Sequence, residues 1–388
     1  VNAGFVWGAL TTALDLTVPD ALDYACRVVK TASQEWGYPY LKLDFLYAAA
    51  VDCQYRDRTL TRAKVLRRGM EAIREAVGPD VTLLGCGAPF GSMLGLVEAM
   101  RIGADVSGDW TPKFGGVGAI FKNEPAMPSA RNSIRNILTR ASLHGHWWIN
   151  DPDCLLIRPD TRLSLAEVQS LASAIALTGG SLLVSDDLPR LPKNRLRIAE
   201  SLLPVIGERA RVLDWFDSGM PSKLRLDLLN ETGEWHLLAA FNWQDKTADL
   251  KLSAADFDLP EGDYWVSEFW NGNVIRTESE ESVVFPAVSA HGCVVTAWRM
   301  HLSGQSVYLG GDLHISQGLE VAEWKSTGKD VKATIRLPRK TSGLVRIGVP
   351  EAVNSVSVNG KSLEARPDQD GVLEIPVDVD GFVRLEIK

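Results

Sequence analysis

From residue 5 to about 187, short apolar segments alternate with longer segments in which apolar residues recur every three to four positions. The short segments predict buried parallel strands, and the longer ones predict amphipathic helices. The predicted strands have apolar bodies and polar ends and cover 5–7, 40–44, 81–86, 100–105, 147–151 and 181–186. The predicted helices cover 19–35, 61–77, 91–99, 130–143, 163–178 and 194–202.

This βα alternation predicts a TIM barrel, whose catalytic groups lie at the carboxyl ends of the strands. A closed (β/α)8 barrel needs eight parallel strands. The pattern supplies six, at the ranges given above. We therefore expect an α/β region that holds six of the eight strands of a barrel.

Beyond residue 187 the period of the pattern changes. From 211 onward, apolar and polar residues alternate with period two between turn residues, which predicts an antiparallel β-sandwich. A further all-β stretch starts near 307, where Asn359 and Gly360 between two strand-like segments predict a hairpin. We predict three domains: a partial (β/α) barrel at 1–205, an antiparallel β-sandwich at 206–300 and an all-β extension at 301–388.

Composition narrows the class of protein. The hydrophobic content of 45% and charged content of 23% are those of a soluble globular protein, and no apolar run is long enough to span a membrane. A net charge of −8 argues against a nucleic-acid partner. The five cysteines are odd in number and form no CxxC motif, which favours a reducing, cytoplasmic compartment over a disulfide framework.

Two predicted strands contain a cation and end on a carboxylate: Lys42 precedes Asp44, and Arg101 precedes Asp105. A retaining glycosidase uses one carboxylate as nucleophile and a second carboxyl group, about 5–5.5 Å away, as acid/base. We predict Asp44 as the nucleophile, because Lys42 shares its face of the strand and would keep it ionised and donate to sugar hydroxyls. We predict Asp105 as the acid/base, with Arg101 bridging Asp44 and a sugar hydroxyl. Asp109, in the loop that follows, is the rival for the acid role.

Other strand ends carry polar groups as well. Asp151, Asp153, Asp186 and Asp187 could bind a metal, but no histidine or ligand spacing singles one out. Hydrogen bonding at the barrel rim is the favoured interpretation, and we expect neither a metal nor a cofactor. Cys86 ends a strand and would line the pocket, although the sequence identifies no base that would make it a nucleophile.

The strand-end motifs resemble those of glycoside hydrolase family 36, the bacterial and archaeal α-galactosidases. YLKLDF at 40–45 is similar to the nucleophile strand of that family, and RIGAD at 101–105 to its acid/base strand. LGCG at 84–87 and WINDPD at 148–153 match two further strand-end motifs. The resemblance covers about residues 3–300 and is most specific for the two carboxylate motifs.

The resemblance implies that terminal α-linked galactose is released from oligosaccharides by double displacement, with retention and without a metal. It implies that Lys42, Arg101, Trp7 and Cys86 shape the sugar subsite. An α-N-acetylgalactosaminidase and a galactosyl-transferring homologue share this machinery and remain alternatives.

The chain also departs from the family pattern. Family members carry an N-terminal β-sandwich and two more barrel strands before the point where this sequence starts. We therefore expect the C-terminal portion of a longer enzyme, in which a missing N-terminal segment or a homo-oligomer covers the open sheet edges. A catalytically incompetent sugar-binding fragment is the alternative from a different class of function.

Overall fold

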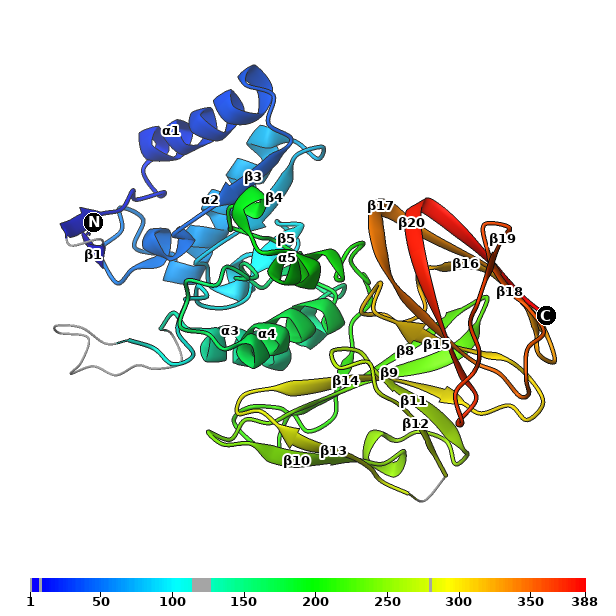
Figure 1. Cartoon of the computed structure of the whole chain (residues 1–388). Coiled ribbons are helices and arrows are strands. Elements are labelled where there is room, and N and C mark those ends of the chain that lie inside the picture. The colour runs from blue at the N-terminus through cyan, green and yellow to red at the C-terminus, as the bar shows by residue number, and fades with distance from the viewer. Residues whose placement is uncertain (1, 7–8, 114–126, 279–280) are drawn as a thin grey trace. The chain divides into compact units, whose positions relative to one another are not determined.

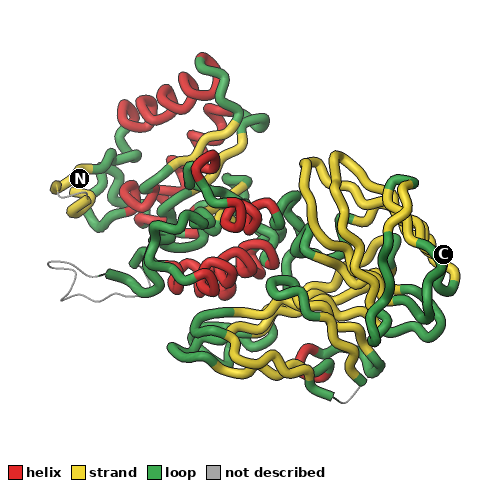
Figure 2. The backbone as a smooth tube through the Cα atoms, viewed as in Figure 1, coloured by secondary structure: helices red, strands yellow, loops and turns green. Residues whose placement is uncertain are grey.

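The computed structural model of the chain describes residues 2–6, 9–113, 127–278 and 281–388 (Figure 1). Its internal contacts define two compact units. The first contains Val1–Ile102 and Leu143–Pro152, and the second contains Gly103–Ser142 and Asp153–Lys388. Helices accompany the strands in the earlier part of the chain, whereas strands dominate from residue 211 onward (Figure 2). Within the described residues, no helix is both long and apolar enough to cross a membrane.

The first unit is built on a parallel sheet with the strand order β3-β4-β5-β6. These strands are β3 (Tyr40–Leu43), β4 (Thr82–Gly85), β5 (Ala99–Arg101) and β6 (Ile149–Asp151). The helices are α1 (Pro19–Lys30), continued by a π-helical turn at Thr31–Glu35, and α2 (Arg62–Val77), with 3-10 turns at Leu46–Ala50 and Phe90–Ser92. A separate antiparallel pair, β1 (Asn2–Val6) and β2 (Ala9–Thr12), precedes them.

One face of the parallel sheet holds the core of this unit. Leu83 and Met100 on that face are fully buried in one cluster with Leu66 and Met70 of α2. Thr61 begins α2 by accepting a hydrogen bond from the Lys64 amide. Because successive side chains of a strand point to opposite faces, the residues next to these core positions face away from α2.

Two predicted elements of the first unit differ in the structure. The segment predicted as the strand 5–7 belongs in part to β1, which pairs antiparallel with β2 and not with the parallel sheet. The predicted helix 91–99 is wrong, because a 3-10 turn and further turns connect β4 to β5. Gly95 in this connection has a φ of +75°, a left-handed conformation that no α-helix accommodates.

Two predicted strands are shorter than expected. The strand 100–105 ends at Arg101, so Asp105 lies in the irregular segment beyond it. The strand 181–186 is reduced to a single parallel bridge between Leu155 and Val184. Strand propensity depends on a neighbouring strand to pair with, and the pattern of apolar residues alone does not reveal whether one is present.

The second unit contains α3 (Ala130–Thr139), α4 (Leu165–Leu177) and α5 (Lys193–Glu200), with a 3-10 turn at Leu188–Arg190. Another 3-10 turn, Ala141–Leu143, follows α3 at the boundary between the two units. The predicted helix 163–178 is confirmed as α4, which begins directly after its N-cap residue Ser164. The Ser164 side chain accepts from the Glu167 amide, while the Glu167 carboxylate accepts from the Ser164 amide. This capping box satisfies two N–H groups that an isolated helix would leave unpaired.

The next part of this unit is an antiparallel sheet with the order β12-β11-β14-β9-β8-β7, accompanied by the pair β10-β13. The bounds are β7 (Arg211–Val212), β8 (Lys223–Asn230), β9 (Gly233–Phe241), β10 (Ala248–Leu252), β11 (Tyr264–Glu268), β12 (Val274–Thr277), β13 (Val283–Val288) and β14 (Cys293–Met300), with a 3-10 turn at Ala255–Phe257. Both faces of β9 are buried. Leu237 and Ala239 pack in the cluster of α3 and α4, and Leu238 and Ala240 pack in the cluster of β10 and β13.

The last sheet has the order β15-β17-β20-β18-β19, and β16 pairs with β17. Its strands are β15 (Val307–Gly311), β16 (Val321–Thr327), β17 (Asp330–Gly348), β18 (Val356–Val358), β19 (Lys361–Leu363) and β20 (Val372–Ile387). The predicted hairpin is confirmed: Val358 pairs with Lys361, and Asn359 and Gly360 have φ values of +51° and +76°. The division into domains at 205 and 300 stays a prediction.

Candidate active site

Four polar side chains follow one another across the carboxyl ends of the parallel strands. Leu43 pairs with Gly85, Gly85 with Met100, and Arg101 with Asp151. One position further along, the same register aligns Asp44, Cys86, Arg101 and Asp151 on the face directed away from α2. We call this set the strand-end row. The carboxyl end of a parallel sheet is where α/β enzymes place their reactive groups.

Asp44 is the first residue of the strand-end row and is exposed. Its Oδ1 accepts a hydrogen bond of 2.7 Å from the amide of Phe45, which has a left-handed backbone with a φ of +54°. The Cys86 thiol donates a second hydrogen bond to this carboxylate. Gly87 lies against the same turn, since a Cβ on Gly87 would come within 3.4 Å of the Phe45 backbone. These contacts define the orientation of the Asp44 carboxylate.

The Cys86 side chain is buried between Asp44 and Arg101. Burial and the hydrogen bond to Asp44 raise the pKa of the Cys86 thiol to about 12. The thiol is therefore protonated at neutral pH and acts as a hydrogen-bond donor. The role of Cys86 in lining the sugar subsite stays a prediction.

Arg101 and Asp151 form a buried ion pair at the other end of the strand-end row. Arg101 Nε lies 3.3 Å from Asp151 Oδ2, and the side chains are 6% and 0% exposed. A buried arginine needs a partner of this kind, because an isolated charge is costly to remove from water. Sequence reasoning missed Asp151 as this partner. Its position at a strand end was visible, but the register between β5 and β6 was not.

Lys42 lies one rung before the strand-end row, in register with Leu84, Ala99 and Ile149. The prediction that Lys42 and Asp44 share a face is supported: both are exposed, while Leu41 and Leu43 pack against the core. The prediction that this strand is buried on both faces is wrong, since Tyr40 is 50% exposed. Among the described strands β3 pairs with β4 alone. A strand at the edge of a sheet has a neighbouring strand on one side only, so more of its surface stays exposed to solvent.

Asp105 belongs to the second unit and is exposed. The residue after it is anchored, because the Val106 amide donates to Asp153 Oδ2 over 2.7 Å. The predicted strand 100–105 does not reach Asp105, since β5 ends at Arg101, so strand alternation does not relate the two side chains. Trp7, predicted to contact the sugar, lies outside the described residues.

Asp109, the rival for the acid role, is buried and paired. Both of its carboxylate oxygens contact the Arg162 guanidinium, and Lys113 Nζ lies 3.5 Å from Oδ1. The hydrogen bonds and charge of Arg162 hold the pKa of Asp109 below its ordinary range. A carboxylate held in its ionised form is a poor proton donor.

The interpretation of the strand-end aspartates as hydrogen-bonding groups is confirmed for Asp186. Its carboxylate accepts from the amides of Ile157 and Arg158, at 2.6 and 3.0 Å, and from the Arg158 guanidinium at 2.7 Å. Across the described part of the chain, no group of three or more His, Cys, Asp or Glu side chains is arranged to hold a metal ion.

Comparison with solved structures shows which known fold the chain shares. No family model matches the chain. The structure is similar to α-galactosidase I from Mortierella vinacea, with a TM-score of 0.55 and 16% identity over 77% of this chain and 75% of that one. It is also similar to a β-L-arabinopyranosidase from Geobacillus stearothermophilus, with a TM-score of 0.52 and 14% identity over 76% of this chain and 65% of that one. The chain shares the fold of the barrel glycosidases.

The predicted fold class, a TIM-barrel region followed by antiparallel β domains, is therefore confirmed. The α-galactosidase from Thermus thermophilus, solved with p-nitrophenyl α-D-galactopyranoside, is 30% identical, with a TM-score of 0.45 over 58% of this chain and 43% of that one. The chain thus spans less than half the length of that α-galactosidase.

Proposed function

We propose that this chain carries the catalytic machinery of a retaining α-galactosidase, with Asp44 as nucleophile and Asp105 as acid/base. The strand-end row is the observation on which the proposal rests. It presents an oriented, exposed carboxylate at the carboxyl end of a parallel sheet, next to a protonated thiol and a buried guanidinium. The affiliation with glycoside hydrolase family 36 is part of the proposal and rests on the motifs YLKLDF and RIGAD.

The reaction takes place in two displacements at the anomeric carbon. In the first, an Asp44 oxygen forms a bond to that carbon while the glycosidic bond breaks, and Asp105 gives its proton to the leaving oxygen. In the second, Asp105 takes a proton from water as the water oxygen attacks the same carbon and the bond to Asp44 breaks. The galactose leaves with the configuration of the substrate.

The surrounding side chains position the nucleophile and the sugar. The Phe45 amide and the Cys86 thiol both donate to Asp44 and hold one orientation of its carboxylate. Lys42, exposed on the same face, is placed to donate to sugar hydroxyls. Arg101 is oriented by its ion pair with Asp151. Trp7 is assigned to the subsite from the motif resemblance alone.

Galactose is the proposed sugar because the fold neighbour from Mortierella is an α-galactosidase and the motifs agree with that activity. The arabinopyranosidase neighbour makes β-L-arabinopyranose the informative competitor, since this sugar has the ring stereochemistry of α-D-galactose without its hydroxymethyl group. A panel of p-nitrophenyl α-galactoside, α-N-acetylgalactosaminide and β-L-arabinopyranoside tests the choice. The highest kcat/KM should belong to the galactoside. A higher kcat/KM for either of the other two substrates would mean that its sugar, and not galactose, is the preferred one.

The nucleophile assignment is tested by azide rescue. The Asp44→Gly variant should lose turnover of p-nitrophenyl α-galactoside, and azide should restore release of nitrophenol with formation of β-galactosyl azide. The β anomer is expected because azide enters the vacated space from the side that Asp44 occupied. Asp44→Gly activity close to that of the unmodified chain would refute the assignment, and Asp187→Gly, at an exposed aspartate that precedes the 3-10 turn Leu188–Arg190, is the matched control.

A sugar-binding fragment without turnover is the second candidate. It is favoured by one observation: among the strands that the structure describes, β3, which leads to Asp44, lies at an edge of the sheet, and its residues Tyr40 and Lys42 are exposed. Isothermal titration with galactose separates the two functions. Galactose binding with no detectable hydrolysis of the aryl galactoside supports the fragment, whereas turnover that depends on Asp44 supports the enzyme.

A further inference from the structure

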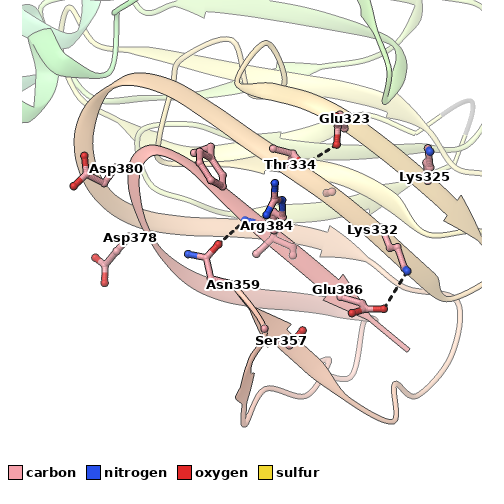
Figure 3. Close-up of a pocket in the computed structure, with 14 residues that line it drawn as sticks. Glu323, Lys325, Lys332, Thr334, Ser357, Asn359, Asp378, Asp380, Arg384 and Glu386 are labelled. Carbon is pink, nitrogen blue, oxygen red and sulfur yellow. Dashed lines mark hydrogen bonds and ion pairs between the residues drawn. The ribbon is translucent and has the colours of Figure 1, made fainter.

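The outer face of the last sheet carries a groove of about 810 Å³. It lies over β16, β17, β18 and β20, and Figure 3 shows the polar side chains that line it. The alternation of β20 produces this face: Val383 and Leu385 are buried in the core of the sheet, while Phe382 and Arg384 are exposed on the other side. The volume falls within the range of about 300–1,000 Å³ that is typical of sites for small ligands.

An aromatic ring lies among these polar groups. Phe382 is 46% exposed, and the Arg384 guanidinium carbon lies 5.0 Å from the centre of its ring. The contact holds the long Arg384 side chain beside the ring instead of leaving it free in solvent. A half-exposed ring with an adjacent fork of N–H donors offers an apolar surface and hydrogen bonds at one place.

The polar groups of the groove are held in place by contacts across the strands. Thr334 Oγ1 donates to Glu323 Oε2 over 3.0 Å, and Lys332 Nζ lies 3.4 Å from Glu386 Oε1 (Figure 3). The Arg384 amide donates to Asn359 Oδ1 over 2.9 Å, which fixes the orientation of the Asn359 side-chain amide. These donors and acceptors are positioned before any ligand arrives, so less entropy is lost on binding.

The charges in the groove are nearly balanced. Four carboxylates line it, from Glu323, Asp378, Asp380 and Glu386, against three cations, from Lys325, Lys332 and Arg384. An anionic or a cationic polymer would meet like charges along part of its length, which opposes binding. A ligand rich in hydroxyl groups avoids this cost, because each hydroxyl both donates and accepts hydrogen bonds.

We propose that this groove is a second carbohydrate-binding site, which holds a neutral polysaccharide or oligosaccharide through residues that take no part in the strand-end row. Phe382 packs against the C–H face of a pyranose ring. Arg384, Asn359 and Glu323 bind its hydroxyls. A chain tethered in this way keeps the protein close to a polymeric substrate, which raises the effective concentration of cleavable bonds.

Affinity electrophoresis of the Asp44→Ala protein tests the site without hydrolysis of the probe. The gels contain galactomannan, xyloglucan or dextran as neutral polymers and polygalacturonate as the anionic one, and the choice of galactomannan rests on the proposed function. We expect at least one neutral polymer to retard the protein. Phe382→Ala should weaken the retardation about tenfold, since a single aromatic contact of this kind is worth roughly that factor.

The matched control is Phe216→Ala, which removes an even more exposed phenylalanine, 89% accessible, outside the groove. Arg384→Ala provides a second groove variant, and its thermal unfolding is compared with that of the parent protein. Retardation that Phe382→Ala and Arg384→Ala both weaken, and that Phe216→Ala leaves unchanged, supports the site. Retardation that the groove variants do not alter, retardation by polygalacturonate alone, or none at all overturns it.

The test is independent of the catalytic proposal. Hydrolysis of p-nitrophenyl α-galactoside by the unmodified chain reports on Asp44 and Asp105, and this substrate has a single sugar ring. If the groove binds a neutral polymer but the aryl galactoside is not cleaved, the proposed function fails and the groove stands. If the aryl galactoside is cleaved while polymer retardation is unaffected by the groove variants, the groove fails and the function stands.

Discussion

The Cys86 thiol donates a hydrogen bond to the Asp44 carboxylate, and this contact joins the ends of two neighbouring strands. The thiol acts here as a hydrogen-bond donor, which it can do only in its protonated form. Burial contributes most to the elevated pKa of about 12, and the carboxylate adds to it because a thiolate beside Asp44 would be repelled. Cysteine chemistry at this site is therefore suppressed in the folded protein.

We predict that Cys86 resists alkylation by iodoacetamide in the native protein. With a pKa of about 12, only a fraction on the order of 10⁻⁴ of the thiol is ionised at pH 8. The rate should rise about tenfold per pH unit between pH 8 and 10, because the thiolate population grows by that factor. Mass spectrometry of the Cys86 peptide measures this, with urea-denatured protein as the control. Equal labelling rates in native and denatured protein would contradict the buried hydrogen bond.

Removal of one partner of the buried ion pair should destabilise the first unit. Asp151→Asn removes the carboxylate charge that faces the buried Arg101 guanidinium in this ion pair, and such a change costs about 3–5 kcal/mol. Urea denaturation measures the loss. The control is Asp187→Asn, which breaks an exposed pair with Arg190 and should cost about 0.5 kcal/mol or less. Similar losses for the two variants would mean that Arg101 is stabilised by something other than Asp151.

The two candidates for the acid role are separated by leaving-group dependence. Asp105→Asn should lower kcat/KM for raffinose by about 10²–10⁴-fold, because the glycosidic oxygen of raffinose needs a proton to depart. The loss for p-nitrophenyl α-galactoside should be smaller in the first step, since nitrophenolate leaves without help. For Asp109→Asn, kcat/KM should stay within about tenfold of the parent value with both substrates, because Arg162 keeps the Asp109 carboxylate ionised in the parent protein. The opposite ranking would transfer the acid role to Asp109.

The hairpin between β18 and β19 predicts a specific cost for a side chain at Gly360. This residue has a φ of +76°, so Gly360→Ala places a Cβ in the left-handed region at a cost of about 1–2 kcal/mol. Gly91→Ala is the matched control, since Gly91 lies outside the left-handed region and a Cβ there meets nothing within 4 Å. Thermal unfolding of the two variants measures the difference. A Gly360→Ala protein as stable as the Gly91→Ala protein would show that residue 360 does not adopt the left-handed conformation in this turn.

The elements predicted best from the sequence are those with a local physical cause. The capping box at Ser164 and the paired positive φ values at Asn359 and Gly360 both depend on residues that are close together in the chain. The predicted helix 91–99 failed for a reason that is also local, since Gly95 adopts a left-handed conformation inside it. The prediction followed the helical spacing of the apolar residues and gave no weight to Gly95. In the folded chain the left-handed backbone of Gly95 is incompatible with an α-helix.

The sequence by itself determined most of the succession of strands and helices, the change to antiparallel sheets, and the presence of Lys42 and Asp44 on one face of a strand. These features follow from periods of two and of 3.6 residues, which any short segment expresses without its neighbours. Only the tertiary structure decided that Asp44, Cys86, Arg101 and Asp151 form a row. It also decided that the Asp109 carboxylate forms an ion pair with the Arg162 guanidinium. Register between strands is set by packing against α2 and by the lengths of the connections, and no single strand carries that information in its own residues.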